Sequence, residues 1–132
     1  MKSIDIRLLG PGRCRITHVP SSVEMNTAMP PEYGGSGDSF SSTDLVAAAL
    51  GSCIATSLQS LLAGARVGDS DLSVSVRKTL SLQPKGIAKL DVTIVCGAAT
   101  TGQLRSKMLA AAQASPVYRA LNPDIVVTVH IE

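Results

Sequence analysis

The segment that decides the fold is Ser39–Leu62, SFSSTDLVAAALGSCIATSLQSLL. It is long and almost free of charge, and it opens with hydroxyl side chains followed by Asp44. Oxygen atoms at such a place accept hydrogen bonds from the first N–H groups of a helix, and a carboxylate there complements the helix dipole. We therefore expect a helix that begins at Ser41 or Ser42, runs to Leu62 and ends at Gly64, a residue type that commonly follows the last turn.

The uncharged run Leu45–Ala65 is about as long as a membrane span, which needs about 20 apolar residues. Its composition indicates otherwise, because it contains polar residues such as Thr56 and Gln59, is rich in alanine, and has neither aromatic belts nor a flanking basic cluster. We expect the buried centre of a fold and no membrane partner. Cys53 lies in the middle of this helix, so its thiol is either inert core or protected chemistry.

Polar and apolar residues alternate before and after this helix, a pattern that is typical of strands. The pattern and the turn residues predict a first hairpin from Ile4 to His18 around Gly10-Pro11-Gly12, a short third strand at Val23–Asn26, and a second hairpin in which Leu72–Val76 and Ala88–Cys96 flank Pro84-Lys85-Gly86. Helices are expected at Thr101–Ala114 and from Pro116, a closing strand at Asp124–Ile131, and a long loop, functional or interfacial, at Met29–Phe40.

The composition favours one domain, residues 1–132, and excludes several classes of protein. Aromatic residues make up 2% of the chain and the twelve basic residues never form a run, so we expect no nucleic-acid partner. The three cysteines form no CxxC pair and the first residues form no signal sequence, which indicates a reduced, cytoplasmic protein. No spacing suits a metal or a phosphate cradle, so we expect no cofactor.

The order of the predicted elements indicates an α+β fold, with antiparallel sheets around a long buried central helix. A helix as apolar as this one must be covered on every side. One sheet of short strands is too small to do that, so we expect an intertwined homodimer in which the long helices share a core.

Two stretches resemble a known family. Phe40–Cys53, FSSTDLVAAALGSC, followed by SPVYRALNPD at residues 115 to 124, is similar to the motifs of the OsmC/Ohr family of thiol peroxidases, and the resemblance spans nearly the whole chain. It implies an intertwined α+β homodimer with active sites near the subunit interface, where a reactive cysteine on the central helix reduces organic hydroperoxides.

The resemblance also assigns residues. It places Cys53 at the peroxidatic cysteine and Ser115 at the position of the resolving cysteine, which this chain therefore lacks. A glutamate common at the helix start in the hydroperoxide-resistance branch falls on Thr43 or, with a shift of one residue, on Asp44.

An arginine from the N-terminal hairpin assists the thiolate in that branch of the family. Arg13 is the nearest candidate and Arg15 the second. Such a cation is needed because a free thiol has a pKa of about 8.5 and Cys53 lies about nine residues into its helix, beyond the reach of the dipole. A guanidinium would favour the thiolate and stabilise charge on the leaving oxygen.

Without a thiol at Ser115, the sulfenic acid formed on Cys53 must be reduced by an external thiol or by Cys14 or Cys96. We expect Cys96 to face the core, whereas Cys14 is undecided. The leading hypothesis is a one-cysteine peroxidase for organic hydroperoxides, which reduces hydrogen peroxide less well. The alternative is a family member without peroxidase turnover that binds a hydrophobic small molecule or a partner at the dimer interface. Tyr33 and Phe40 either line a substrate entrance or anchor the long loop.

Overall fold

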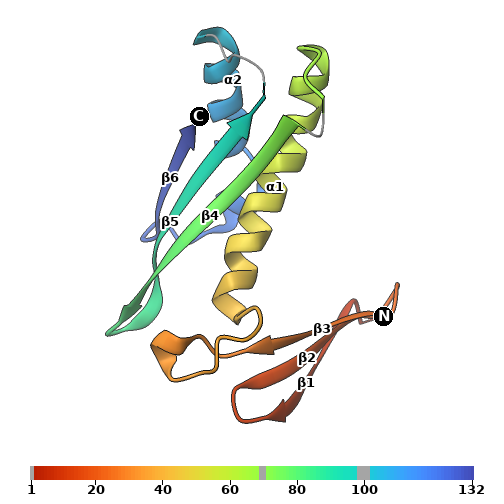
Figure 1. Ribbon diagram of the computed structural model, residues 1–132, viewed down its shortest axis with the longest axis vertical. Coiled ribbons are helices and arrows are strands. Elements are labelled where there is room, and N and C mark those ends of the chain that lie inside the picture. Colours follow the sequence, from red (N-terminus) through yellow and green to blue (C-terminus); the bar gives the residue numbers. More distant parts are fainter. Residues whose placement is uncertain (1, 69–70, 98–101) are drawn as a thin grey trace. The chain divides into compact units, whose positions relative to one another are not determined.

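The computed structural model describes residues 2–68, 71–97 and 102–132, and its chain divides into two compact units, Met1–Leu45 and Val46–Glu132 (Figure 1). That residues 1–132 form a single domain stays a prediction. In chain order the described elements are β1 (Ile4–Gly10), β2 (Arg13–His18), β3 (Val23–Ala28), the 3-10 turn η1 (Pro31–Tyr33), α1 (Ser42–Gly64), β4 (Leu72–Leu82), β5 (Lys85–Cys96), α2 (Gly102–Gln113), α3 (Pro116–Ala120) and β6 (Val126–Ile131).

The first unit contains an antiparallel sheet in the order β1-β2-β3, as the alternating pattern predicts. Ile6 pairs with Ile16, which pairs with Met25, and paired residues share one face of a sheet. This apolar face is poorly covered within the chain, since Leu8 is 78% exposed and Ile6 61%. The third strand is two residues longer than predicted, because its pairing with β2 continues to Ala28.

The loop after β3 is held to the sheet by backbone hydrogen bonds. The N–H of Ala28 donates to the carbonyl of Phe40 at 3.0 Å, which ties together the two ends of the loop, and the N–H of Met29 donates to Gly12 at 2.8 Å. Gly35 lies so close to Met29 that a Cβ atom there would stand 1.9 Å from the Met29 carbonyl oxygen. Residues 29–39 thus form a compact loop with closed ends, in which Gly35 allows two backbone segments to touch.

Helix α1 begins with a reciprocal cap. The hydroxyl of Ser41 accepts a hydrogen bond from the Asp44 N–H at 3.0 Å, and the Asp44 carboxylate accepts one from the Ser41 N–H at 2.9 Å. This is the capping-box arrangement, with aspartate at the third helical position. The predicted start at Ser41 or Ser42 and the predicted end at Gly64 are both confirmed.

The second unit contains a three-stranded sheet with β5 in the middle. Strands β4 and β5 form the predicted hairpin, but β6 pairs with β5 in parallel, with Val92 opposite Val129. The expectation of purely antiparallel sheets was therefore wrong for this pair. The parallel pairing follows from the segment that contains α2 and α3, because a helical crossover returns the chain in the same direction.

A register shift changes one predicted face of β5. Between Thr79 and Leu80 the pairing moves by one residue, so that Leu80 lies opposite Ile87 and Thr79 opposite Lys89. Ala88, which alternation assigns to the inner face, is therefore exposed, and Ile87 packs against the core instead. An extra residue in one strand turns the side chains that precede it to the opposite face of the sheet, and alternation in the sequence does not reveal such a shift.

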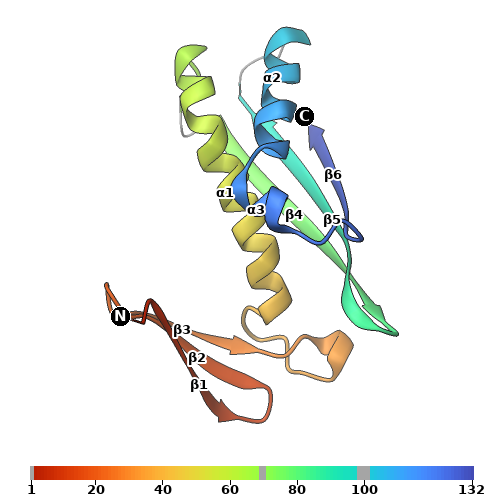
Figure 2. The same cartoon turned by 180° about the vertical axis from the view of Figure 1, so that it is seen from behind.

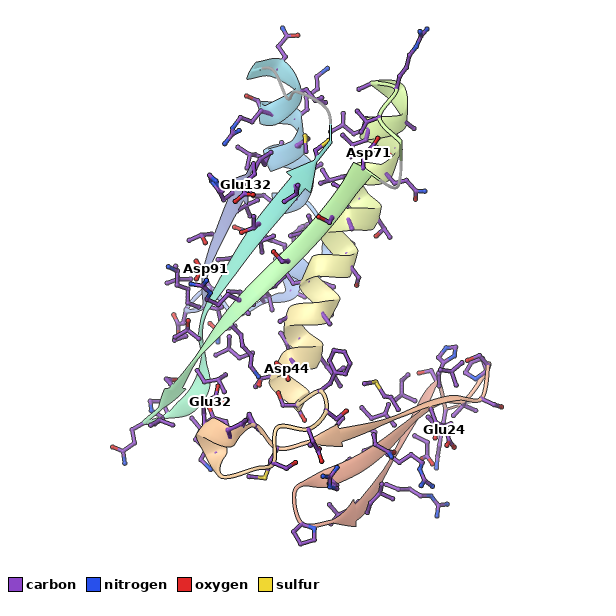
Figure 3. All side chains as sticks on the ribbon, in the orientation of Figure 1. Glu24, Glu32, Asp44, Asp71, Asp91 and Glu132 are labelled. Carbon is purple, nitrogen blue, oxygen red and sulfur yellow. The ribbon has the colours of Figure 1, made fainter. Side chains whose placement is uncertain are left out.

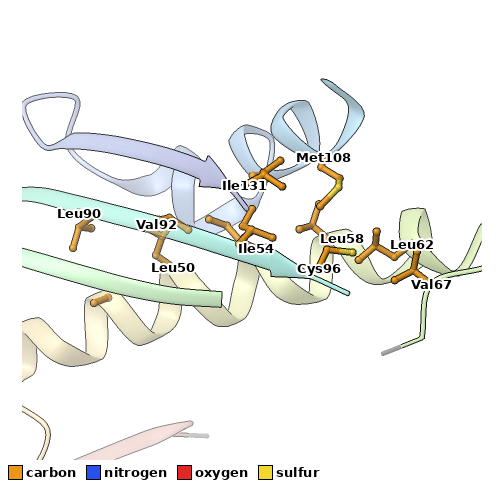
Figure 4. Packing of buried hydrophobic residues seen from close by; sticks show 13 residues of the cluster. Leu50, Ile54, Leu58, Leu62, Val67, Leu90, Val92, Cys96, Met108 and Ile131 are labelled. Carbon is orange, nitrogen blue, oxygen red and sulfur yellow. The ribbon is translucent and has the colours of Figure 1, made fainter. Parts of the chain in front are cut away.

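The core of the second unit lies between α1 and the sheet (Figure 4). Leu50, Ile54 and Leu58 are fully buried, and they lie with residues of β5 such as Leu90 and Val92 in one cluster. Burial of a leucine-sized side chain stabilises a fold by about 1.5–3 kcal/mol. This cluster is thus the main stabilising feature of the second unit.

Only one face of α1 is buried within the chain. The buried residues of α1 are Ala47, Leu50, Gly51, Ile54, Leu58 and Leu62, whereas the opposite face is exposed. The expectation of a helix covered on every side is therefore not met by a single copy. Among the described residues, α1 is the one helix that passes a test of length and apolarity for a membrane span, a test that the core helix of a soluble protein also passes.

Gly51 brings α1 close to β4. A Cβ atom at this position would lie 3.1 Å from a methyl group of Val76 and 3.7 Å from one of Val74. Figure 2, which views the protein from behind, shows α1 running along the sheet of the second unit. The small residue thus allows the helix to pack closely on the edge strand, two positions before Cys53.

The remaining boundaries of the second unit nearly match the prediction. The short helix begins at Pro116 as expected, and α2 ends at Gln113, while the expected start of α2 at Thr101 lies outside the described residues. β6 begins at Val126, two residues after the predicted Asp124. The reason is a turn in which the Asn122 side-chain oxygen accepts the N–H of Asp124 at 2.8 Å.

Candidate functional site

Cys53 lies at the edge of the buried face of α1. Its side chain is half-buried, while its neighbours Leu50 and Ile54 are 0% exposed. The helix begins at Ser42, so Cys53 is several turns beyond the first one, and the helix dipole provides no local positive charge for its thiolate. The position gives the thiol partial access, whereas a thiol of the inert core is fully enclosed.

Hydroxyl groups line the helix next to Cys53. Thr56 donates to the carbonyl oxygens of Ser52 and Cys53, at 3.0 and 3.1 Å, and Ser52 donates to Ala49 at 3.2 Å. Such bonds back to the preceding turn satisfy the hydroxyl protons within the helix itself. These hydroxyls are therefore part of the helix structure, and their protons are already shared with its backbone.

Ser115 connects α2 to α3 and is 1% exposed. Its hydroxyl donates to the carbonyl of Ala112 at 2.7 Å, and its own carbonyl accepts the N–H of Arg119 at 3.1 Å. A hydroxyl has one proton to donate. That proton is donated to a carbonyl in the last turn of α2 and not to Cys53, although the hydroxyl oxygen can still accept a hydrogen bond.

Arg13 stands at the start of β2 and contacts the long loop. One of its terminal nitrogens, Nη2, donates to the Asp38 carboxylate at 2.5 Å and to the Ser36 hydroxyl at 3.3 Å. The hydrogen bond from Arg13, and next that from Ser36, holds the pKa of Asp38 below its usual range. The same carboxylate raises the pKa of Arg13, so both groups stay charged.

Arg15 is held separately on the sheet. Its Nε atom lies 3.9 Å from a carboxylate oxygen of Glu24 on β3, and both side chains are about half exposed. An exposed pair of this kind contributes little to stability. The structure thus gives the two candidate arginines different partners, and only Arg13 is bound to the loop.

The two residues aligned with the family glutamate belong to the start of α1. The carboxylate of Asp44 caps the Ser41 N–H, and the hydroxyl of Thr43 lies 3.0 Å from that of Ser41 (Figure 3 labels Asp44). The interpretation of Asp44 as a helix-start residue is confirmed. The carboxylate that contacts Arg13 is Asp38, which the sequence analysis did not single out.

The other two thiols differ in burial. Cys96 is 8% exposed in the core of the second unit, as alternation along β5 predicts. Cys14 is half-buried on β2, where its carbonyl accepts a long 3.5 Å hydrogen bond from Thr27. Neither of them forms a disulfide in the structure, and neither does Cys53.

Solved structures share this fold. A protein of Psychrobacter arcticus, provisionally described as an osmotic stress induced and detoxification response protein, is 24% identical with a TM-score of 0.91, and the match covers 100% of this chain and 96% of that chain. An organic hydroperoxide resistance protein of Legionella pneumophila is 18% identical with a TM-score of 0.73, covering 100% and 98%. One of Elizabethkingia anophelis is 18% identical with a TM-score of 0.71, covering 100% and 96%.

No curated protein matches the chain. The family model for OsmC-like proteins, however, matches residues 35–130, a range that contains all of α1 and almost all of the second unit. The match includes Cys53 and Ser115, while Arg13 lies before it. The chain therefore belongs to the family of OsmC-like proteins.

Proposed function

We propose that this protein is a thiol-dependent peroxidase that reduces organic hydroperoxides through Cys53, and hydrogen peroxide less well. The observation that carries the proposal is the half-buried position of Cys53 beside fully buried Leu50 and Ile54. Membership of the OsmC-like family and the fold shared with organic hydroperoxide resistance proteins support it. Partial access lets the peroxide group of such a substrate reach the sulfur.

The reaction requires the thiolate form of Cys53. The sulfur attacks the distal oxygen of the hydroperoxide, the O–O bond breaks, and the alkoxide takes up a proton to leave as an alcohol. Cys53 then carries a sulfenic acid. Two equivalents of an external thiol return it to the thiol, forming one disulfide between the reductant molecules and one water.

Arg13 is the residue that we propose to favour the thiolate and to stabilise negative charge on the leaving oxygen. A guanidinium keeps its charge at every physiological pH, and its hydrogen bonds to anions are among the strongest in proteins. Ser115 occupies the position of the resolving cysteine. A hydroxyl cannot form a disulfide with a sulfenic acid, which is why we propose a one-cysteine mechanism with an external reductant.

We further propose that the protein acts as a homodimer in the cytoplasm. Two surfaces support the dimer: the apolar face of the first sheet, on which Leu8 and Val23 are 78% and 65% exposed, and the uncovered face of α1. Exposed apolar surfaces of this kind are commonly covered by a partner. A second copy would supply that cover for both.

The test is the rate at which the reduced protein reacts with tert-butyl hydroperoxide and with hydrogen peroxide, followed by intact mass with a sulfenic-acid trap. We expect rapid, stoichiometric trapping at Cys53, a preference for the organic peroxide, and complete loss in Cys53→Ser. Cys14→Ser is the matched control and should keep the rate. Activity retained by Cys53→Ser, or a rate equal to that of free cysteine, contradicts the proposal.

One observation favours the second candidate, a protein that has kept the scaffold for binding a hydrophobic molecule or partner. The hydroxyl of Ser115 is buried and used to end α2, as expected of a residue kept for structure. Ser115→Cys separates the two candidates. A gain in turnover with a dithiol reductant indicates an intact peroxidase site, whereas no gain, together with an apolar ligand retained on purification, favours the binding role.

A further inference from the structure

The long loop of the first unit, residues 29–39, is anchored by several hydrogen bonds, and its Asp38 contacts Arg13. Two hydrogen bonds add to the one between Ala28 and Phe40 that closes the loop. The hydroxyl of Ser39 donates to the carbonyl oxygen of Asn26 at 2.8 Å, and the N–H of Gly37 donates to the carbonyl oxygen of Met29 at 3.3 Å. Asp38 lies between these two anchored residues. The residues on both sides of Asp38 are therefore tied to β3 or to the residue that follows it, Gly37 through its backbone and Ser39 through its side chain.

Asp38 and Ser36 act together on Arg13. Both accept from the same nitrogen of the guanidinium, and the N–H of Asp38 is 3.5 Å from the Ser36 hydroxyl. Arg13, Ser36 and Met29 also line a cavity of about 250 Å³ within the first unit. A guanidinium is a planar fork of five N–H donors, so fixing one nitrogen limits the directions in which the others can donate.

We propose that Asp38, a carboxylate of the long loop, is the positioning residue for Arg13 in this chain. The proposal rests on the proposed function, in which Arg13 assists the thiolate of Cys53. It also gives the long loop a role: its glycines and hydrogen bonds place one carboxylate where β2 begins.

Two other acids of the first unit have partners of their own. Asp44 caps the Ser41 N–H at the start of α1, and Glu24 lies beside Arg15 on the sheet. The bond between Asp38 and Arg13 spans 25 residues of sequence, and both side chains are about half exposed. An exposed ion pair contributes little to stability, so removing it should change the direction of Arg13 more than the stability of the protein.

The test is a double-mutant cycle on the full-length protein. The rate of Cys53 oxidation by tert-butyl hydroperoxide in a single turnover is measured for wild type, Asp38→Asn, Arg13→Ala and the double variant. We expect Asp38→Asn to slow the reaction about fivefold to tenfold in the wild-type background and less than about twofold in the Arg13→Ala background. Equal slowing in both backgrounds, no slowing in either, or a faster reaction overturns the proposal.

Two further variants separate positioning from a structural effect. Asp38→Glu keeps the charge and should restore part of the rate, and Asp5→Asn, at a partly exposed acid on β1, should leave it unchanged. The unfolding midpoint of Asp38→Asn should equal that of wild type. No rescue by glutamate, or a fall in the midpoint that matches the loss in rate, contradicts a positioning role.

Failure of the proposed function is distinguishable from failure of this inference. If wild-type Cys53 reacts with peroxide no faster than free cysteine, peroxidase activity is excluded. The same cycle is then measured with the rate of Cys53 alkylation by iodoacetamide, which needs the thiolate but no peroxide. Coupling between Asp38 and Arg13 in that rate supports the inference, and additive effects overturn it.

Discussion

Each of the two units of this chain is stabilised internally by a different kind of interaction. In the second unit, Leu58 and its neighbours are fully enclosed between α1 and the sheet, whereas in the first unit the large apolar residues Leu8, Val23 and Ile6 are exposed. The first unit relies on backbone hydrogen bonds, close turns and solvated ion pairs. Burial is the dominant source of stability in proteins. The comparison therefore teaches that the first unit depends on a cover from outside itself for most of its apolar surface, whereas the second already encloses a core and leaves mainly one face of α1 uncovered.

The largest expected effect tests the core of the second unit. Leu58→Ala removes a fully buried side chain and leaves a cavity, so the free energy of unfolding should fall by about 2–5 kcal/mol. Leu82→Ala, at a position 63% exposed, is the matched control and should change it by less than about 0.5 kcal/mol. Urea denaturation gives both values. Similar losses for the two variants would remove the contrast on which the comparison rests.

The next effect tests the apolar face of the first unit. Ile6→Ser should lower the free energy of unfolding by about 1.5–3 kcal/mol per protomer if a second copy covers the face, because an isoleucine-sized apolar surface is then lost from the interface. Dimer dissociation, measured by sedimentation, should shift to higher protein concentration. Arg7→Ser, on the opposite face of β1, is the control. Unchanged association in Ile6→Ser would show that this face stays uncovered.

A smaller effect is expected where the loop meets α1. Ser41→Ala removes the oxygen that accepts the Asp44 N–H, and loss of such a cap costs about 1 kcal/mol. Ser42→Ala, the exposed next residue, should be close to neutral. Thermal unfolding of both variants measures the difference. Equal midpoints would mean that tertiary contacts, and not the cap, fix the start of the helix.

The smallest effect concerns the outer face of the second sheet, where Asp91 lies on β5 (Figure 3). Hydrogen bonds from Thr128 on β6, and next from Lys89, lower the pKa of Asp91. A carboxyl with a lowered folded-state pKa contributes stability at neutral pH, and loses it as the pH falls below the ordinary carboxyl range. Asp91→Asn should therefore be less stable than wild type at pH 7 and approach it at pH 3.

The control for that prediction is Asp124→Asn, at an exposed acid whose side chain has no such pair of donors among the described interactions. At pH 7 its stability should lie within about 0.5 kcal/mol of that of wild type, as expected of an exposed surface substitution. Urea midpoints between pH 3 and pH 7 measure both variants. A constant difference between Asp91→Asn and wild type at every pH would contradict the electrostatic reason.

Much of the fold can be predicted from the sequence because local signals decide it. Ser41 and Asp44 identify the start of α1, and Pro116 identifies the start of α3, since each acts on groups within one turn of itself. The facing of Cys96 follows from alternation. The exposure of Ala88 could not be predicted, because it depends on a register shift that leaves no local signal. The parallel pairing of β6 could have been, because the predicted helices between β5 and β6 already indicate a crossover.

The candidate site shows the same division. Cys53 and Ser115 are recognisable from contiguous motifs, and Arg13 from its place in the first hairpin. Asp38 lies 25 residues from Arg13 in a loop rich in proline, glycine and serine, and nothing local indicates that its carboxylate contacts that arginine. The exposed face of α1 could likewise not be predicted from the sequence, because the residue pattern of a nearly uniformly apolar helix does not indicate which side faces outward.

The parallel pairing of β6 with β5 also has a consequence for the order of folding. The β4–β5 hairpin needs only a tight turn, so it can form early, whereas β6 can join only after the whole segment that contains α2 and α3 has been made and folded back. Until then, the inner strand of the sheet has an open edge next to Leu90, Val92 and Ile94. Open apolar edges pair readily with other chains. The newly made protein is thus most prone to aggregation in the interval before its last strand is in place.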